Sequence, residues 1–203
     1  MEFRTIKEDG QVQEEIKKSR FICHAKRVYS EEEAREFITT IKKEHYKATH
    51  NCSAFIIGKR SEIKRTSDDG EPSGTAGVPM LGVLENHNLT NVCVIVTRYF
   101  GGIKLGAGGL VHAYGGAVSE AIEKVEAVTR GRRELYTVEC PHATAGRLEA
   151  DLRGRGINIT DTDYGRAVTF TVAVRPGGLD ELQEMLAALS QGQISAHEAG
   201  SAW

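Results

Sequence analysis

The chain has 203 residues, is 40% hydrophobic and 27% charged, and carries a formal net charge of −2. This composition is ordinary for a globular protein of one large or two small domains. It excludes a global basic field, so a nucleic acid or an anionic membrane would have to meet a local patch. No apolar run approaches the roughly 20 residues of a membrane helix. Because the four cysteines are scattered, without a CxxC pair, we expect a reducing, cytoplasmic location.

The composition changes near residue 130, because all 11 lysines lie at or before Lys124. We therefore expect two domains, residues 1–130 and 131–203, joined by a linker at residues 129–132.

The first domain is predicted to mix strands and helices. Ser30 and Glu33 form a capping box that opens a helix to about residue 46. Alternating or apolar runs predict extended segments at 11–16, 19–28, 52–58 and 91–99. Two further helices are expected over 78–85 and 109–128.

The second domain has a simpler predicted order. Strands are expected over 134–140, 157–161, 167–174 and 194–197, and helices over 142–153 and 179–189. The resulting order is β-α-β-β-α-β, which is that of a ferredoxin-like domain. The whole chain is therefore predicted to be α+β.

A glycine-rich loop between a strand and a helix is the first candidate site. It has five glycines in residues 101–109 and is flanked by cations and aromatics. Backbone N–H groups at a helix start bind anions, and exposed aromatic rings stack on bases. We expect a nucleic-acid or phosphate site formed by Arg98, Tyr99, Phe100, Gly101, Gly102 and Lys104. The alternative is a tight structural turn.

An acidic loop over residues 67–77 is the second candidate. Asp68, Asp69 and Glu71 can bind a hard cation or cap the next helix, for which Ser73 or Thr75 can be the N-cap. The spacing is not that of an EF-hand, so a structural or partner-contacting loop is favoured. We expect no metal and no cofactor.

Two weaker patterns complete the candidates. His45, His50 and Cys52 contain zinc-ligand residue types, but no further pair completes four ligands nearby. Lys64 and Arg65, after Lys59 and Arg60, form a basic edge that can extend a phosphate-tracking surface. The alternative for the first pattern is a set of polar residues that close a helix and pack against a strand. The alternative for the second is a solvent-exposed turn.

Four blocks taken together resemble the IMPACT family. They are residues 19–21, residues 48–54, the block SDDGEPSGTAGVPML at 67–81 and the block VTRYFGGIKLG at 96–106. The resemblance covers about residues 15–128, and the tail resembles the small ferredoxin-like domain that bacterial members carry. The resemblance implies that five further residues belong to the family's motifs: Asp68, Asp69, Glu71, Thr75 and His50.

The resemblance implies a first domain with the left-handed βαβ fold of ribosomal protein S5 domain 2. That fold recurs in elongation factor G, whose last domain is ferredoxin-like. Eukaryotic relatives restrain a kinase of translation initiation with the help of an RWD domain, and we do not transfer that role.

Two functions follow as hypotheses. The first is a translation-linked regulator that binds RNA, the ribosome or a translation-associated protein. In this hypothesis the protein does not bind a membrane and does not catalyse a reaction. The alternative is an enzyme acting on a phosphorylated small molecule or nucleotide, in which Asp69 and Glu71 hold Mg²⁺ or act as a general base. The sequence does not set the oligomeric state.

Overall fold

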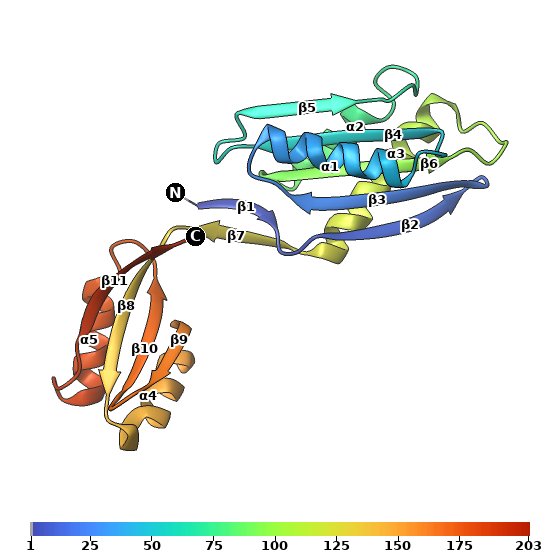
Figure 1. Cartoon of the computed structure of the whole chain (residues 1–203). Helices are drawn as coiled ribbons and strands as arrows, with labels where there is room; N and C mark the ends of the chain where they lie inside the picture. Colours follow the sequence, from blue (N-terminus) through green and yellow to red (C-terminus); the bar gives the residue numbers. More distant parts are fainter. Residues whose placement is uncertain (1) are drawn as a thin grey trace. The chain divides into compact units, whose positions relative to one another are not determined.

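The computed structural model describes residues 2–203, which divide into two compact units, Glu2–Arg130 and Gly131–Trp203 (Figure 1). Each unit has its own apolar core.

The first unit is built on a five-stranded antiparallel sheet in the order β2-β3-β6-β4-β5. The strands are β2 (Gly10–Ile16), β3 (Ser19–Arg27), β4 (His50–Ile57), β5 (Ile63–Ser67) and β6 (Val92–Tyr99). The central strand β6 is buried along nearly its whole length. A strand covered on both faces is expected to be a continuous apolar run, and that run is what the sequence shows.

Helices cover both faces of this sheet (Figure 1). Helix α1 (Glu31–Glu44) packs on one face, and α2 (Gly77–Asn86) and α3 (Gly106–Val125) pack on the other. Because side chains alternate along a strand, Ile95 lies in the core under α1 and Val96 in the core under α2 and α3. The predicted cap of α1 is confirmed, since the Ser30 hydroxyl accepts from the Glu33 N–H at 3.1 Å.

Three boundaries in the first unit differ from the prediction. The expected linker at residues 129–132 overlaps a strand instead: β7 (Ala127–Gly131) pairs with β1 (Glu2–Ile6) in a two-stranded sheet. The charged residues of β1 hide its alternation, in which Phe3 and Thr5 are buried. Helix α3 begins three residues earlier than expected, because glycines that disfavour helices fill its first turn.

The second unit has the predicted order β-α-β-β-α-β and confirms the α+β class. Its elements are β8 (Arg133–Cys140), α4 (His142–Gly154), β9 (Asn158–Tyr164), β10 (Val168–Val174), α5 (Leu179–Ser190) and β11 (Ala196–Ala202). The antiparallel sheet runs β11-β8-β10-β9, and leucines of α4 and α5 share one core with β8 and β10. The last strand begins later and runs longer than predicted, because its polar residues carry little strand signal.

The four cysteines, Cys23, Cys52, Cys93 and Cys140, are free thiols in buried positions. Burial raises the pKa of Cys52 to about 12, so its thiol stays protonated at neutral pH. None of the helices in residues 2–203 combines the length and hydrophobicity needed to cross a bilayer.

Candidate functional site

Three connections meet at one end of the five-stranded sheet: the β2–β3 hairpin, the α1–β4 connection and the β6–α3 loop (Figure 1). The register places Arg20 opposite Tyr99, and His50 opposite Arg98. Thr49 joins two of the connections: its N–H donates to the Arg98 carbonyl at 2.9 Å, and its hydroxyl accepts from the Phe100 N–H at 3.1 Å. The glycine-rich loop is therefore held by its neighbours.

At Gly101 the backbone of the β2–β3 hairpin approaches the loop closely. A Cβ atom at Gly101 would lie 1.9 Å from the Lys18 carbonyl oxygen, so no larger residue fits. The next glycine, Gly102, has a φ of 91°, in the region that favours glycine. These two glycines are therefore required by the backbone conformation of the loop. This agrees with the alternative interpretation, in which the loop is a tight structural turn.

Arg98 lies in the core rather than on the loop surface. It is 5% exposed, and its Nη1 atom forms an ion pair with Glu71 Oε1 at 2.7 Å. Its Nε and Nη2 atoms lie 3.4 and 3.3 Å from the Ser19 hydroxyl. This ion pair joins the glycine-rich loop to the acidic loop, and it leaves the Arg98 guanidinium neutralised instead of open to a phosphate.

Glu71 is the centre of this buried cluster. Its Oε1 atom also accepts from the Tyr114 hydroxyl at 2.7 Å, and its Oε2 atom lies 3.6 Å from His50 Nε2. Burial, together with Cys52 and Glu71, raises the pKa of Tyr114 well above its ordinary value, so its hydroxyl remains a donor.

Tyr99 points to the opposite face of the sheet from Arg98, as alternation along β6 requires. Its hydroxyl lies 2.8 Å from His45 Nδ1, and the Arg20 guanidinium lies 4.3 Å above its ring. Phe100 is different, since 48% of it is exposed at the loop edge. The Arg98 guanidinium lies 5.4 Å from the centroid of the Phe100 ring, and the rest of that ring is accessible.

Asp68 caps α2, and the expected cap by Ser73 or Thr75 is wrong. The Asp68 carboxylate accepts from the N–H groups of Gly74, Ala76 and Gly77 at 2.9, 3.1 and 2.8 Å. Thr75 instead donates its hydroxyl to the Pro72 carbonyl. Partial burial raises the pKa of Asp68, but the three donors together outweigh it and lower the pKa below its ordinary value.

Asp69 is also engaged with the protein. Its carboxylate forms an ion pair with Lys42 at 2.8 Å and accepts from the Asn51 N–H at 2.7 Å. Partial burial raises its pKa, and these contacts lower it by more. The three acidic side chains of the loop therefore bind backbone or basic groups of the chain itself.

His45, His50 and Cys52 are not brought together. His45 lies at Tyr99 on the α1 face, whereas His50 and Cys52 face the acidic loop. His50 Nδ1 donates to the Asp69 carbonyl at 2.8 Å, and the Cys52 thiol donates to the Asp68 carbonyl at 3.0 Å. Within residues 2–203, no group of three or more histidine, cysteine or acidic side chains is placed to hold a metal ion.

Lys64 and Arg65 point to opposite faces of β5. Lys64 forms an ion pair with Glu85 of α2 at 2.7 Å, and Arg65 Nε lies 3.6 Å from Glu31 of α1. The predicted basic edge is therefore split by the sheet and does not extend the glycine-rich loop.

A different set of basic and aromatic residues surrounds that loop. We call this set the basic end: it consists of exposed residues from all three connections, which are Lys17, Lys18, Arg20, Tyr46, Lys47, Phe100 and Lys104. Sequence reasoning found only the last two. The Lys17–Lys18 pair at a hairpin turn was a usable signal, but only the strand register shows that it lies beside the loop.

A pocket of about 410 Å³ opens beside the basic end. Glu71, Arg98 and His50 line it together with the apolar Leu105 and Leu110. Phe100, Lys104 and the first turn of α3 also line it, with Thr49 and Pro72, and the N-cap residue Leu105 makes no side-chain cap to that turn. A mainly apolar pocket with a few convergent polar groups is typical of a small-ligand site.

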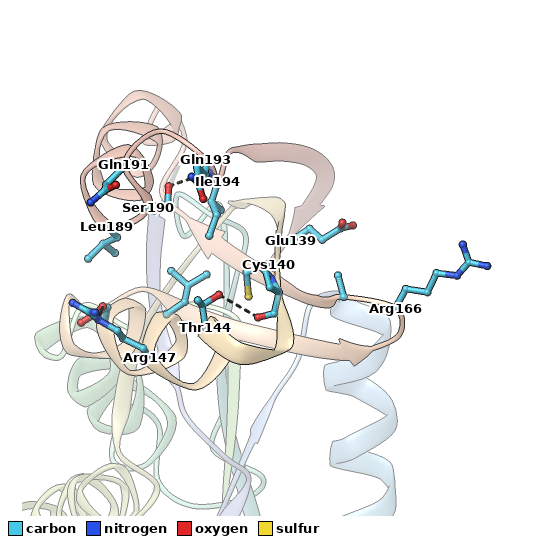
Figure 2. Close-up of a pocket in the computed structure, with 14 residues that line it drawn as sticks. Glu139, Cys140, Thr144, Arg147, Arg166, Leu189, Ser190, Gln191, Gln193 and Ile194 are labelled. Carbon is cyan, nitrogen blue, oxygen red and sulfur yellow. Dashed lines mark hydrogen bonds and ion pairs between the residues drawn. The ribbon is translucent and has the colours of Figure 1, made fainter.

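The second unit contains a separate pocket of about 690 Å³, lined by residues of α4, the end of β8, the β9–β10 turn, and the end of α5 with the turn that follows it (Figure 2). Its polar groups stabilise local turns: the Thr144 hydroxyl donates to the Pro141 carbonyl, and the Ser190 hydroxyl accepts from the Ile194 N–H. None of the predicted site residues lies there.

Comparison with known proteins places the chain in a family. Residues 17–122 match the Impact N-terminal domain, and residues 138–193 match a domain of unknown function, DUF1949. The chain therefore belongs to the IMPACT family, as the sequence motifs indicated.

Among its relatives, the IMPACT family member YvyE of Bacillus subtilis (strain 168) is 45% identical over 194 residues, which cover 96% of this chain and 89% of YvyE. The family member YigZ of Escherichia coli (strain K12) is 37% identical over 185 residues, covering 90% of this chain and 91% of YigZ. A crystal structure of a hypothetical protein is similar at 36% identity and a TM-score of 0.63, covering 96% of each chain.

Proposed function

We propose that this protein is a translation-linked regulator that binds RNA, either free or in the ribosome, through the basic end of its first unit. Two things support a role in translation: membership of the IMPACT family and the pairing of an S5 domain 2-like unit with a ferredoxin-like unit, which resembles part of a translation factor. Fold alone does not determine function, so the site has to carry the argument.

The observation that carries the proposal is the gathering of cations and aromatic rings from three connections. The lysines of the basic end suit phosphates, because neutralising phosphates releases counterions and drives binding. Phe100 and Tyr46 are 48% and 73% exposed and suit stacking on unpaired bases. The combination favours single-stranded RNA over a protein partner.

Binding is favoured over catalysis by the state of the acidic loop. Asp68, Asp69 and Glu71 each hold a backbone group or a basic side chain of the chain. A magnesium-dependent reaction at these carboxylates would first have to break those contacts. The proposed function is therefore a binding function.

Fluorescence anisotropy with a labelled single-stranded RNA tests the proposal. We expect the variant with Lys17→Ala, Lys18→Ala and Lys104→Ala to bind more weakly than the wild type. Its plot of log affinity against log salt concentration should be shallower by about 2, since each lost phosphate contact to a single strand reduces the slope by about 0.7.

The matched control is Lys64→Ala with Arg65→Ala, which removes cations away from the basic end. We expect this control to keep the wild-type slope. Equal losses in the two variants, or no measurable binding of RNA by the wild type, would overturn the proposal. Capture of a protein partner by a surface other than the basic end would also count against it.

A further inference from the structure

The 410 Å³ pocket has two hydrogen-bond acceptors side by side on its lining. The Asp69 carbonyl can only accept, so His50 Nδ1 carries the hydrogen of their 2.8 Å hydrogen bond. A neutral His50 therefore presents the lone pair of Nε2, 3.6 Å from Glu71 Oε2. The Glu71 side chain is only 3% exposed, and within residues 2–203 no hydrogen bond reaches its Oε2 atom.

Two adjacent acceptors with no hydrogen between them are complementary to a group with two hydrogens. An amino group can donate one hydrogen to Glu71 Oε2 and the other to His50 Nε2. A carbonyl oxygen at the same place would face two acceptors and would be disfavoured.

Another part of the pocket lining suits an anion. The first turn of α3, at Gly106 and Ala107, lines the pocket without a side-chain cap, so its N–H groups and the positive end of the helix dipole are available. Lys104 adds a positive charge there. Phe100, Leu105 and Leu110 also line the pocket, and their apolar side chains suit a flat ring.

We infer that this pocket binds a single nucleotide whose base carries an exocyclic amino group, with its phosphate at the first turn of α3. The volume lies within the range of small-ligand sites, at about 300–1,000 Å³. The inference rests on the proposed function in taking an RNA chain as the source of the nucleotide. A free mononucleotide has the same chemistry, so the test separates the two sources.

Calorimetric titration of the full chain at pH 8 with cytidine monophosphate, uridine monophosphate and cytidine is the first test. Cytosine presents an amino group where uracil presents a carbonyl oxygen. We expect the cytidine nucleotide to bind at least about tenfold more tightly than the uridine nucleotide, by analogy with the discrimination of a good base contact. Cytidine without phosphate should also bind more weakly. Equal affinities of the two nucleotides would overturn the inference.

Variants on α3 locate the site. Ala107→Trp places a large ring at the pocket lining and should abolish binding of cytidine monophosphate. Val111→Trp is the matched control, because Val111 is exposed on the same helix, 42% accessible, and does not line the pocket. Equal behaviour of the two variants would contradict the assigned site.

A comparison of oligocytidine with oligouridine RNA identifies the source of the nucleotide. Preference for oligocytidine that disappears in Ala107→Trp supports an RNA residue in the pocket. Discrimination among mononucleotides without any in RNA would overturn RNA as the source. If cytidine monophosphate binds and no RNA does, the proposed function fails while the pocket assignment stands.

Discussion

The ion pair between Arg98 and Glu71 shows how much the role of one residue depends on its surroundings. A guanidinium next to a glycine-rich loop suits a phosphate, but here a carboxylate 2.7 Å away neutralises it. Taking both charges out of water is costly, and their attraction offsets that cost only while both are present. The pair is therefore a structural element between two family motifs.

Removing one partner of this pair should destabilise the protein strongly. We expect Arg98→Met to lower the free energy of unfolding by about 3–5 kcal/mol, because it leaves the Glu71 carboxylate buried without a counter-charge. Urea unfolding followed by circular dichroism measures the change.

The double variant Arg98→Met with Glu71→Gln is the control for this prediction. It removes both charges, so much of the stability should return, and the two substitutions should be non-additive. If Arg98→Met is as stable as the wild type, the buried Glu71 carboxylate does not need the Arg98 counter-charge for stability.

At the scale of elements, the contact between the β2–β3 hairpin and the β6–α3 loop sets the geometry of the basic end. Gly101 allows this contact, because a side chain there would overlap the Lys18 backbone. The lysines of the hairpin and Lys104 of the loop come from opposite ends of the first unit's sequence, and this close approach brings them to one end of the sheet.

Replacing Gly101 should disrupt that contact. We expect Gly101→Ala to destabilise the first unit by at least about 1–3 kcal/mol, the usual cost of overpacking, and to weaken RNA binding as well. Thermal unfolding and the anisotropy assay measure the two effects.

The control, Gly116→Ala, lies in α3 with no atom within 4 Å of the added Cβ. Alanine is the better helix former, so this variant should be more stable by up to about 1 kcal/mol. If Gly101→Ala is as stable as this control, the hairpin does not depend on the close approach.

Periodicity predicted the elements where packing and local sequence agree. The capping box of α1 and the apolar run of β6 are examples, and both are confirmed. Strands β1 and β5 were missed because they are short and contain several polar residues. Strand β5 pairs only with β4 at the sheet edge, and β1 pairs with β7, which lies far along the chain and is not recorded by local sequence. The glycines of α3 concealed its start because glycine disfavours a helix.

The candidate site was predicted only in part. The two loops were singled out from the sequence, and the structure joins them through Arg98 and Glu71. Alternation along a strand is enough to separate Tyr99 from Arg98, and Lys64 from Arg65, but each pair was grouped by its position in a motif. Which residues of other strands lie beside them depends on strand register, which the sequence patterns do not record.

At the scale of the whole molecule, the two units have separate cores. Residues 131–203 bury leucines of α4 and α5 against one face of their own four-stranded sheet. A unit of about this size with its own core is near the lower range of independently folding domains.

We therefore expect residues 131–203 to fold when expressed alone. Far-ultraviolet circular dichroism should show helix and sheet, with a cooperative thermal transition. A non-cooperative melt would mean that this unit requires residues 2–130. Phe170 belongs to the core of this unit. The substitution Phe170→Ala should lower its free energy of unfolding by about 3–5 kcal/mol and abolish the transition.

The buried cysteines have a practical consequence for following this protein in solution. All four thiols are shielded, so reagents that react with thiolates have little to attack on the folded chain. A cysteine introduced by Ser73→Cys, in the exposed part of the acidic loop, would then be the preferred point of attachment for a fluorophore or spin label. The native thiols would become reactive only when the cores open. The rate at which they are labelled would therefore report the rate of unfolding.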